Sequence, residues 1–156
     1  MARKTIDEIR KIVEALIRKV NSRCPFKIAE HLNILVFHLP LDEVEGLWLH
    51  EKRIKAIILN KGMSLYRQRL VCSHELGHAI MHYDINEAFM RAYTHLSTDR
   101  YEIEANFFAF ELEFNNLDED ITWDGLINRY GLNKEEITLM YKFLEGQRKL
   151  GDYDYW

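Results

Sequence analysis

The chain has 156 residues, is 47% hydrophobic and carries a formal net charge of −4, a composition that fits one compact domain with a buried core. Its longest apolar runs, residues 34–37 and 56–59, are far shorter than the roughly 20 residues of a membrane-spanning helix, and its interspersed charges lack the basic stripe of proteins that mainly bind nucleic acid. Because charged residues interrupt the N-terminal segment and two cysteines make no disulfide framework, we expect a cytoplasmic protein without a signal peptide.

The N-terminal part of the chain predicts two helices and a strand. Thr5 and Glu8 have the spacing of a capping box, and apolar residues then follow at helical intervals to about Val20. Residues 26–32 can form a second, short helix, and residues 34–39 have the apolar character of a strand.

A hairpin is expected next. Residues 47–50 and 54–59 are typical of two strands joined by a turn at Glu51-Lys52-Arg53. Together with the strand over residues 34–39, they predict a small antiparallel three-stranded sheet. Helices arranged around one small sheet predict an α+β fold.

Further helices are expected in the second half of the chain, after Ser64 as an N-cap. Their approximate bounds are residues 64–82, 99–114, 123–130 and 134–149. The last two have the outline of a helix-turn-helix, and Asn133 with Glu136 forms a capping box at the turn. However, Glu135 and Glu136 would face DNA phosphates with negative charge, so we interpret the pair as packing or partner-binding structure.

The sequence His74-Glu75-Leu76-Gly77-His78 lies inside the expected helix over residues 64–82. Residues four apart lie one above the other on a helix, so His74 and His78 can direct two imidazoles at one point. Glu75 is close enough to hydrogen-bond a water at that point without becoming a ligand itself. The pattern predicts a zinc site with the geometry of a metalloprotease. The alternative is two helix histidines satisfied by hydrogen bonds.

A catalytic zinc generally has three protein ligands, so the two histidines require a third donor. We expect Glu102, because Asn106 lies one turn later on the same helix face and could hydrogen-bond a metal-binding histidine. The side chain of Glu104 points about 200° round the helix from that of Glu102, which makes Glu104 the second choice. Alternatively, Glu102 completes a capping box with Asp99.

Other residues near the motif are expected to have structural roles. His82 continues the four-residue spacing but lies one turn too far along the helix axis to join the site, so we expect it to be peripheral. Five residues are expected in the core: Cys72, Met81, Phe107, Phe108 and Phe110.

Three segments together resemble the ImmA/IrrE family of metallopeptidases. They are the run His-Glu-Leu-Gly-His-Ala-Ile-Met-His at 74–82, the pattern Glu-x-Glu-Ala-Asn-x-Phe-Ala at 102–109 and the strand end Ile-Ile-Leu-Asn at 57–60. The similarity covers about residues 25–115. Where many members run into a Leu-Leu-x-Pro ending, residues 111–116 contain no proline, so the wall beyond the third ligand, and with it the substrate preference, is expected to differ.

The resemblance implies a small gluzincin-like fold, which we assign to a zincin-like metallopeptidase domain over residues 1–120. Residues 121–156 would be a C-terminal helical extension packed on the same compact unit. The resemblance also implies that three residues hold Zn²⁺: His74, His78 and Glu102. Glu75 would be the general base. The implied substrates are helix-turn-helix repressors of phages, integrative elements or stress regulons, which are cleaved to relieve repression.

We therefore expect a zinc-dependent endopeptidase with a narrow protein substrate and no direct binding of nucleic acid or membrane. Manganese or iron can use the same ligands, although this set most favours zinc. The alternative function is a module that binds a repressor or antitoxin-like partner without cutting it and keeps the zinc site as structure. Tyr93, His95 and Tyr101 are candidate oxyanion donors. A substrate strand could pair with the sheet edge at residues 47–49.

Overall fold

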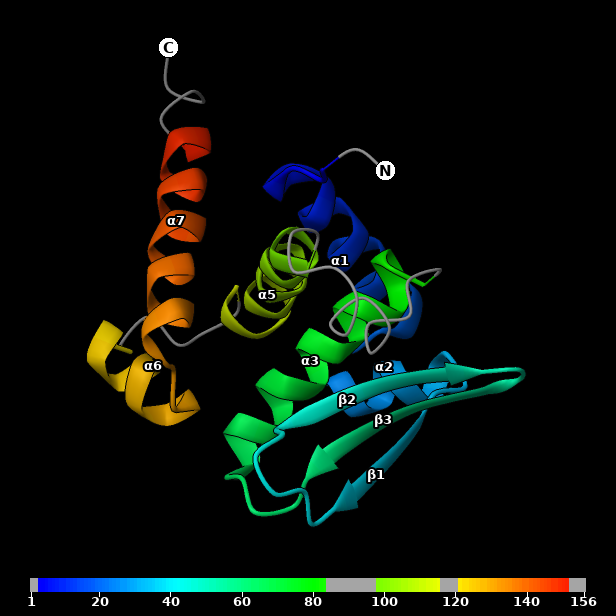
Figure 1. Cartoon of the computed structure of the whole chain (residues 1–156). Coiled ribbons are helices and arrows are strands. Elements are labelled where there is room, and N and C mark those ends of the chain that lie inside the picture. The colour runs from blue at the N-terminus through cyan, green and yellow to red at the C-terminus, as the bar shows by residue number, and fades with distance from the viewer. Residues whose placement is uncertain (1–2, 84–97, 116–120, 152–156) are drawn as a thin grey trace.

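The computed structural model describes residues 3–83, 98–115 and 121–151. In chain order the described elements are α1 (Ile6–Val20), α2 (Pro25–His31), β1 (Leu35–Leu39), β2 (Gly46–Glu51), β3 (Ile54–Asn60), α3 (Leu65–Met81), α5 (Thr98–Phe114), α6 (Trp123–Tyr130) and α7 (Lys134–Gly151). The predicted α+β fold is confirmed, with helices packed against a small three-stranded sheet (Figure 1). Most of the expected loop over residues 83–98 lies outside the described residues.

The helix starts follow the caps that the sequence predicts. In α1, Thr5 Oγ1 accepts the backbone N–H of Glu8, and a carboxylate oxygen of Glu8 accepts the backbone N–H of Thr5. Ser64 Oγ accepts a backbone N–H in the first turn of α3. Asn133 and Glu136 make the same reciprocal pair before α7. Each cap satisfies N–H groups that a helix start leaves without a partner in the helix.

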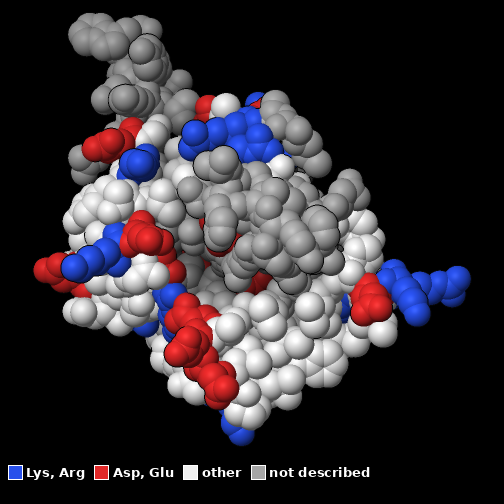
Figure 2. Space-filling view, viewed as in Figure 1, with Lys and Arg blue, Asp and Glu red and all other residues white. Residues whose placement is uncertain are grey.

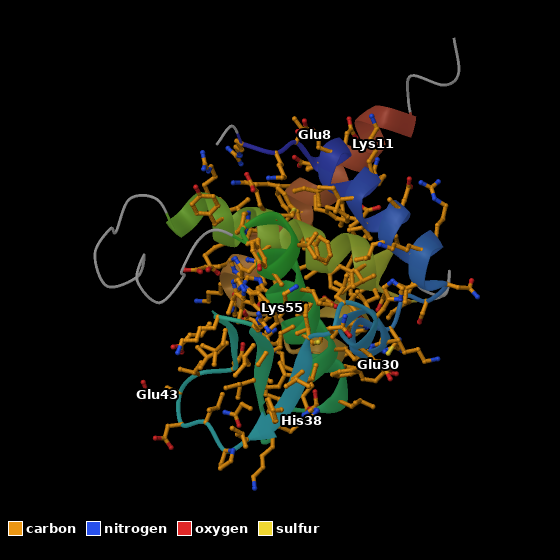
Figure 3. The ribbon with its side chains drawn as sticks, turned by 90° about the vertical axis from the view of Figure 1, so that its right-hand side faces the viewer. Glu8, Lys11, Glu30, His38, Glu43 and Lys55 are labelled. Carbon is orange, nitrogen blue, oxygen red and sulfur yellow. The ribbon has the colours of Figure 1, made fainter. Side chains whose placement is uncertain are left out.

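Helix α1 buries one side against α5 and exposes the other. Ile9 and Val13 are each 1% exposed, and α1 packs on α2 and α5. Glu8 and Lys11 lie on the outer side of the helix (Figure 3). The amphipathic pattern of residues 6–20 therefore fixes which side of α1 faces the core.

The sheet is mixed, which corrects the expectation of an antiparallel sheet. Strand β3 lies in the middle, parallel to β1 and antiparallel to β2. The tight turn after Glu51 requires antiparallel pairing of β2 with β3, whereas residues 40–45 carry the chain from β1 past β3 to the far edge. The central place belongs to the most buried strand, because Ile57 and Leu59 of β3 are fully buried. Asn60 Nδ2 donates to two carbonyls of the crossing connection.

The core lies between the sheet and the helices α3 and α5. Helix α3 packs on β2 and β3 from one side and on α5 from the other. All five residues predicted for this core are buried, namely Cys72, Met81, Phe107, Phe108 and Phe110. Burial strongly raises the pKa of the Cys72 thiol, so this side chain is a core residue rather than a reactive one.

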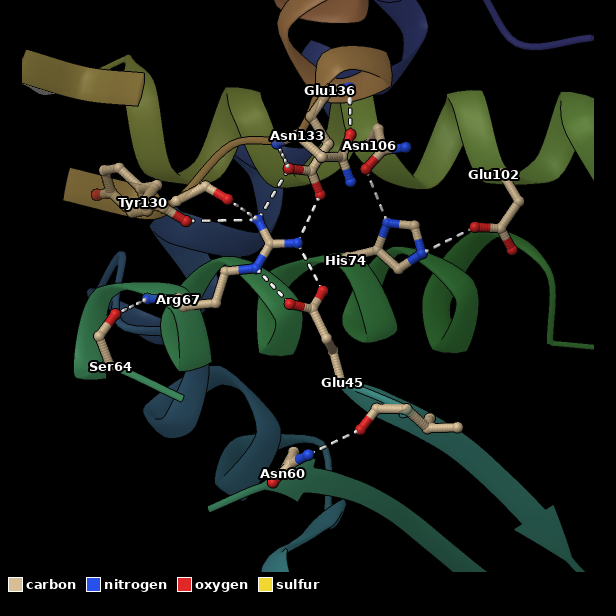
Figure 4. A network of polar contacts seen from close by, with 12 residues as sticks. Glu45, Asn60, Ser64, Arg67, His74, Glu102, Asn106, Tyr130, Asn133 and Glu136 are labelled. Atoms are coloured by element: carbon tan, nitrogen blue, oxygen red, sulfur yellow. Dashed lines mark hydrogen bonds and ion pairs between the residues drawn. The ribbon is translucent and has the colours of Figure 1, made fainter. Parts of the chain in front are cut away.

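Arg67, near the start of α3, joins the sheet to the C-terminal helices (Figure 4). Its guanidinium donates to both carboxylate oxygens of Glu45, at 2.9 and 2.5 Å, and to both of Glu136, at 2.8 Å each. Arg67 is 8% exposed. Burial lowers the pKa of Arg67, but the hydrogen bonds to Glu136 and Glu45 outweigh this effect and raise it. We call these three residues the Arg67 clamp.

The C-terminal helices pack on the rest of the protein, α6 on α3 and α7 on α5. Glu136 contributes to this packing through Arg67, whereas Glu135 is exposed. The domain boundary at residue 120 stays a prediction, because residues 116–120 lie outside the described part of the chain. Within the described ranges, none of the helices combines the length and the apolar character that crossing a membrane requires.

Candidate metal centre

Three side chains of metal-ligand type converge between α3 and α5. His74 Nε2 lies 3.1 Å from His78 Nε2. The two carboxylate oxygens of Glu102 lie 3.2 Å from His74 Nε2 and 3.3 Å from His78 Nε2. One ligand atom from each residue can be chosen so that all three lie within 4.8 Å of one another. The structure thus brings together the three residues that the sequence predicts as ligands.

This convergence depends on a close approach of the two helix backbones. A Cβ atom on Gly77 would lie 3.1 Å from Ala105 Cα and 3.2 Å from Phe108 Cβ. Ala105 and Phe108 are fully buried and have no room to withdraw. Glycine at position 77 therefore lets α3 and α5 come close enough for Glu102 to reach both histidines.

Asn106 sets the orientation of His74 (Figure 4). Its Oδ1 atom lies 3.0 Å from His74 Nδ1. Because a carbonyl oxygen only accepts hydrogen bonds, Nδ1 of His74 carries a proton, and in the neutral imidazole the lone pair of Nε2 then faces the cluster. The prediction that the amide of Asn106 hydrogen-bonds one of the two histidines is confirmed.

His78 is buried and neutral. It is 3% exposed, and burial lowers its pKa to about 4, although the neighbouring carboxylate of Glu102 acts in the opposite direction. A neutral imidazole is the form that binds a metal. Two imidazoles and one carboxylate are a donor set that fits a catalytic Zn²⁺ with three protein ligands. The residues present therefore fit the metal that the sequence predicts.

The carboxylate of Glu75, the residue after His74 on α3, lies near the start of β2. A Cβ atom on Gly46 would lie 3.3 Å from Glu75 Oε1 and 2.5 Å from Val71 Cγ1, so glycine lets the strand lie directly on the helix here. Glu75 is 4% exposed and does not belong to the ligand cluster. Glu75 is therefore a buried carboxylate outside the ligand set.

Two further residues lie next to the cluster, and one of them, His82, differs from the sequence-based expectation. His82 is not peripheral: it is 2% exposed, and its Nδ1 atom lies 3.1 Å from His78 Nδ1. Glu104, the second choice as a ligand, lies instead on His82, with Oε2 at 2.8 Å from His82 Nε2. His82 lies too far along the axis of α3 to bind the metal, but Nδ1 of His78 faces its ring. The four-residue spacing of His78 and His82 was the signal for this contact.

The remaining candidates lie partly outside the described residues. This is the case for Tyr93, His95 and the side chain of Asp99. The rings of Tyr101 and His82 meet edge to face, with their centroids 4.8 Å apart. The hydroxyl of Tyr101 accepts a hydrogen bond from Arg100. Figure 2 shows basic and acidic side chains interspersed over the described part of one face, with acidic atoms visible in a central hollow.

Comparisons with known proteins agree with this geometry. The model of the IrrE N-terminal-like domain, Peptidase_M78, matches residues 29–120. "Uncharacterized immunity region protein 2" of Bacillus phage phi105 is 41% identical over 105 residues, which are 67% of this chain and 66% of that protein. "Metallopeptidase ImmA" of Bacillus subtilis (strain 168) is 25% identical over 134 residues, which are 83% of this chain and 75% of that protein. The resemblance to ImmA and IrrE is confirmed, and the chain belongs to the Peptidase_M78 family of metallopeptidases.

Proposed function

We propose that this protein is a zinc-dependent endopeptidase that cleaves a helix-turn-helix repressor and thereby relieves repression. The observation that carries the proposal is the convergence of His74, His78 and Glu102 within 4.8 Å, with the buried carboxylate of Glu75 on the helix that bears both histidines. Membership of a metallopeptidase family supports hydrolysis of peptide bonds. Similarity to a protein named for a phage immunity region supports a regulatory substrate.

In this mechanism the metal would be held by His74 and His78 through Nε2 and by Glu102 through its carboxylate. A bound Zn²⁺ supplies a Lewis acid for water and for the peptide carbonyl. Glu75 takes the proton of the attacking water and passes it to the leaving amine. Asn106 keeps the metal-binding nitrogen of His74 free of its proton by holding that proton on Nδ1.

The start of β2 is the place where the substrate backbone would bind. Among the described strands, β2 pairs only with β3, so its other side forms an edge of the sheet. Gly46 brings this edge onto α3 at Glu75. A substrate strand that pairs with residues 47–49 would therefore extend beside the general base.

The test compares the wild type with Glu75→Gln and with Glu135→Gln, a control at an exposed glutamate. Elemental analysis should find one zinc per chain in all three proteins. Mass spectrometry of candidate helix-turn-helix repressors after incubation should show cleavage by the wild type and the control, and a loss of about 100-fold or more in Glu75→Gln.

A fully active Glu75→Gln protein would contradict this mechanism. If Glu75→Gln instead relieves repression in a reporter strain as efficiently as the wild type, while no repressor is cut, the protein is a binding module that keeps its zinc site as structure. If the wild type contains no zinc, even after zinc is supplied, neither the endopeptidase nor the binding module has a zinc site.

A further inference from the structure

A continuous chain of hydrogen bonds leads away from the rear of His78. His78 Nδ1 lies 3.1 Å from His82 Nδ1, and His82 Nε2 lies 2.8 Å from Glu104 Oε2. The other oxygen of Glu104 accepts the backbone N–H of Lys4 at 2.9 Å. The three side chains are 2–3% exposed, so water does not compete for these contacts. The chain joins α3, α5 and the segment that precedes α1.

The partners determine where each proton lies. A carboxylate only accepts, so His82 carries its proton on Nε2 and donates it to Glu104. The Nδ1 atom of neutral His82 is then an acceptor, and the proton between the two rings belongs to Nδ1 of His78. As a result, the lone pair of His78 lies on Nε2, the atom that faces His74 and Glu102.

We propose that His82 and Glu104 are positioning residues that hold His78 in the tautomer and orientation required for metal binding. The proposal rests on the proposed function, because it takes His78 as a metal ligand. A carboxylate behind the hydrogen-bonded imidazole makes the ligand nitrogen more basic, as it does in carboxylate–histidine–metal arrangements. Here an additional imidazole transmits that effect from Glu104 to His78.

The ring of His82 is fixed on several sides. Its backbone N–H donates to the carbonyl of His78 at 2.9 Å, and the ring of Tyr101 contacts it edge-on at 4.8 Å. Glu104 is fixed in turn by Lys4. Since neither group can turn away without losing these contacts, the orientation of His78 is set before any metal binds.

The two histidine ligands thus receive different support from the same helix. The neutral amide of Asn106 holds His74, whereas the carboxylate of Glu104 acts on His78 through His82. Helix α5 therefore supplies one ligand and two supports from residues 102–106.

The experiment measures zinc affinity by chelator competition in the wild type, in His82→Phe and in His82→Asn. His82→Phe removes the acceptor and should weaken zinc binding about 10- to 100-fold. His82→Asn places an amide oxygen near the position of Nδ1, so it should restore much of that loss. His31→Phe, on the exposed end of α2, is the matched control and should bind as the wild type does. Circular dichroism of the zinc-free proteins reports folding.

Zinc affinity in folded His82→Phe equal to that of the wild type would overturn the proposal and leave the proposed function intact. A wild type that binds no zinc would overturn both. Long-range ¹H–¹⁵N NMR of the zinc-free wild type needs no variant and adds an independent check. It should find the proton of His78 on Nδ1 and that of His82 on Nε2, and the opposite tautomers would overturn the proposal.

Discussion

The buried polar side chains in the two halves of helix α3 have different kinds of partner. In the N-terminal half, Arg67 lies between two carboxylates of this same chain, and donors and acceptors match one another. In the C-terminal half, ligand atoms of His74, His78 and Glu102 converge within 4.8 Å. Opposite charges stabilise the fold, whereas converging ligand atoms contribute affinity for a cation.

This difference predicts that the two halves can be disabled separately. Loss of a side chain from the Arg67 clamp should lower the free energy of unfolding and leave metal binding largely unchanged. Loss of the partly exposed Glu102 side chain from the ligand cluster should lower metal affinity and leave the stability of the zinc-free protein largely unchanged.

The largest effect is expected for Glu102→Ala. Zinc affinity should fall on the order of a thousandfold, because a complete zinc site contributes about 10–16 kcal/mol through only a few ligands. The side chain of Glu102 is 30% exposed, so its removal leaves little space in the core, and the zinc-free protein should melt near the wild-type temperature. Chelator competition and thermal unfolding measure the two quantities. Zinc binding that survives in Glu102→Ala would instead assign the third ligand elsewhere.

A smaller effect, on stability, is expected for Arg67→Met. The free energy of unfolding should fall by about 3 kcal/mol, because Glu136, 14% exposed at its side chain, is left without its cation. Glu45 is half exposed and contributes less. Urea unfolding measures the loss, and zinc affinity of the folded variant should stay within a few-fold of the wild type.

The double variant Arg67→Met with Glu136→Gln is the control for this explanation. It should recover part of the lost stability, because the second substitution removes the buried charge that the first one leaves behind. Equal stability of the single and double variants would mean that Arg67 acts through packing of its side chain rather than through the ion pair.

Features set by neighbours along one helix could be predicted from the sequence. The caps at Thr5 and Ser64 depend on residues three positions away, and the convergence of His74 with His78 depends on a spacing of four. The contact of Asn106 with His74 follows from the same geometry once the two helices are assumed to pack. Local periodicity therefore predicted most of the candidate ligand set.

Features that join distant segments could not be predicted in this way. The strand order depends on the path of residues 40–45, whose composition leaves open whether β1 pairs with β2 or with β3. The Arg67 clamp joins α3 to Glu45 and Glu136, which lie 22 and 69 residues away. The link from His82 to Glu104 depends on how α5 is turned about its axis, which only the packed core determines.

The smallest effect on stability is expected for Gly46→Ala, at the start of β2, where the strand lies directly on helix α3. The free energy of unfolding should fall by about 1 kcal/mol. The new Cβ atom would lie 2.5 Å from Val71 Cγ1, so the start of β2 must move away from Glu75. Cleavage should fall about 10-fold, because the general base and the substrate strand lose their alignment. Zinc affinity should not change, since the ligand side chains face α5 rather than β2.

Gly62→Ala is the matched control, because its Cβ atom would meet no closer neighbour than Asn60 Oδ1 at 3.4 Å, an ordinary contact. It should cleave and bind zinc as the wild type does. If Gly46→Ala also weakens zinc binding, β2 supports the ligands as well as the substrate, and the metal centre extends across α3 to its sheet side. If it lowers cleavage alone, β2 and Glu75 act on the substrate, while the ligands of α3 and α5 hold the metal without support from β2.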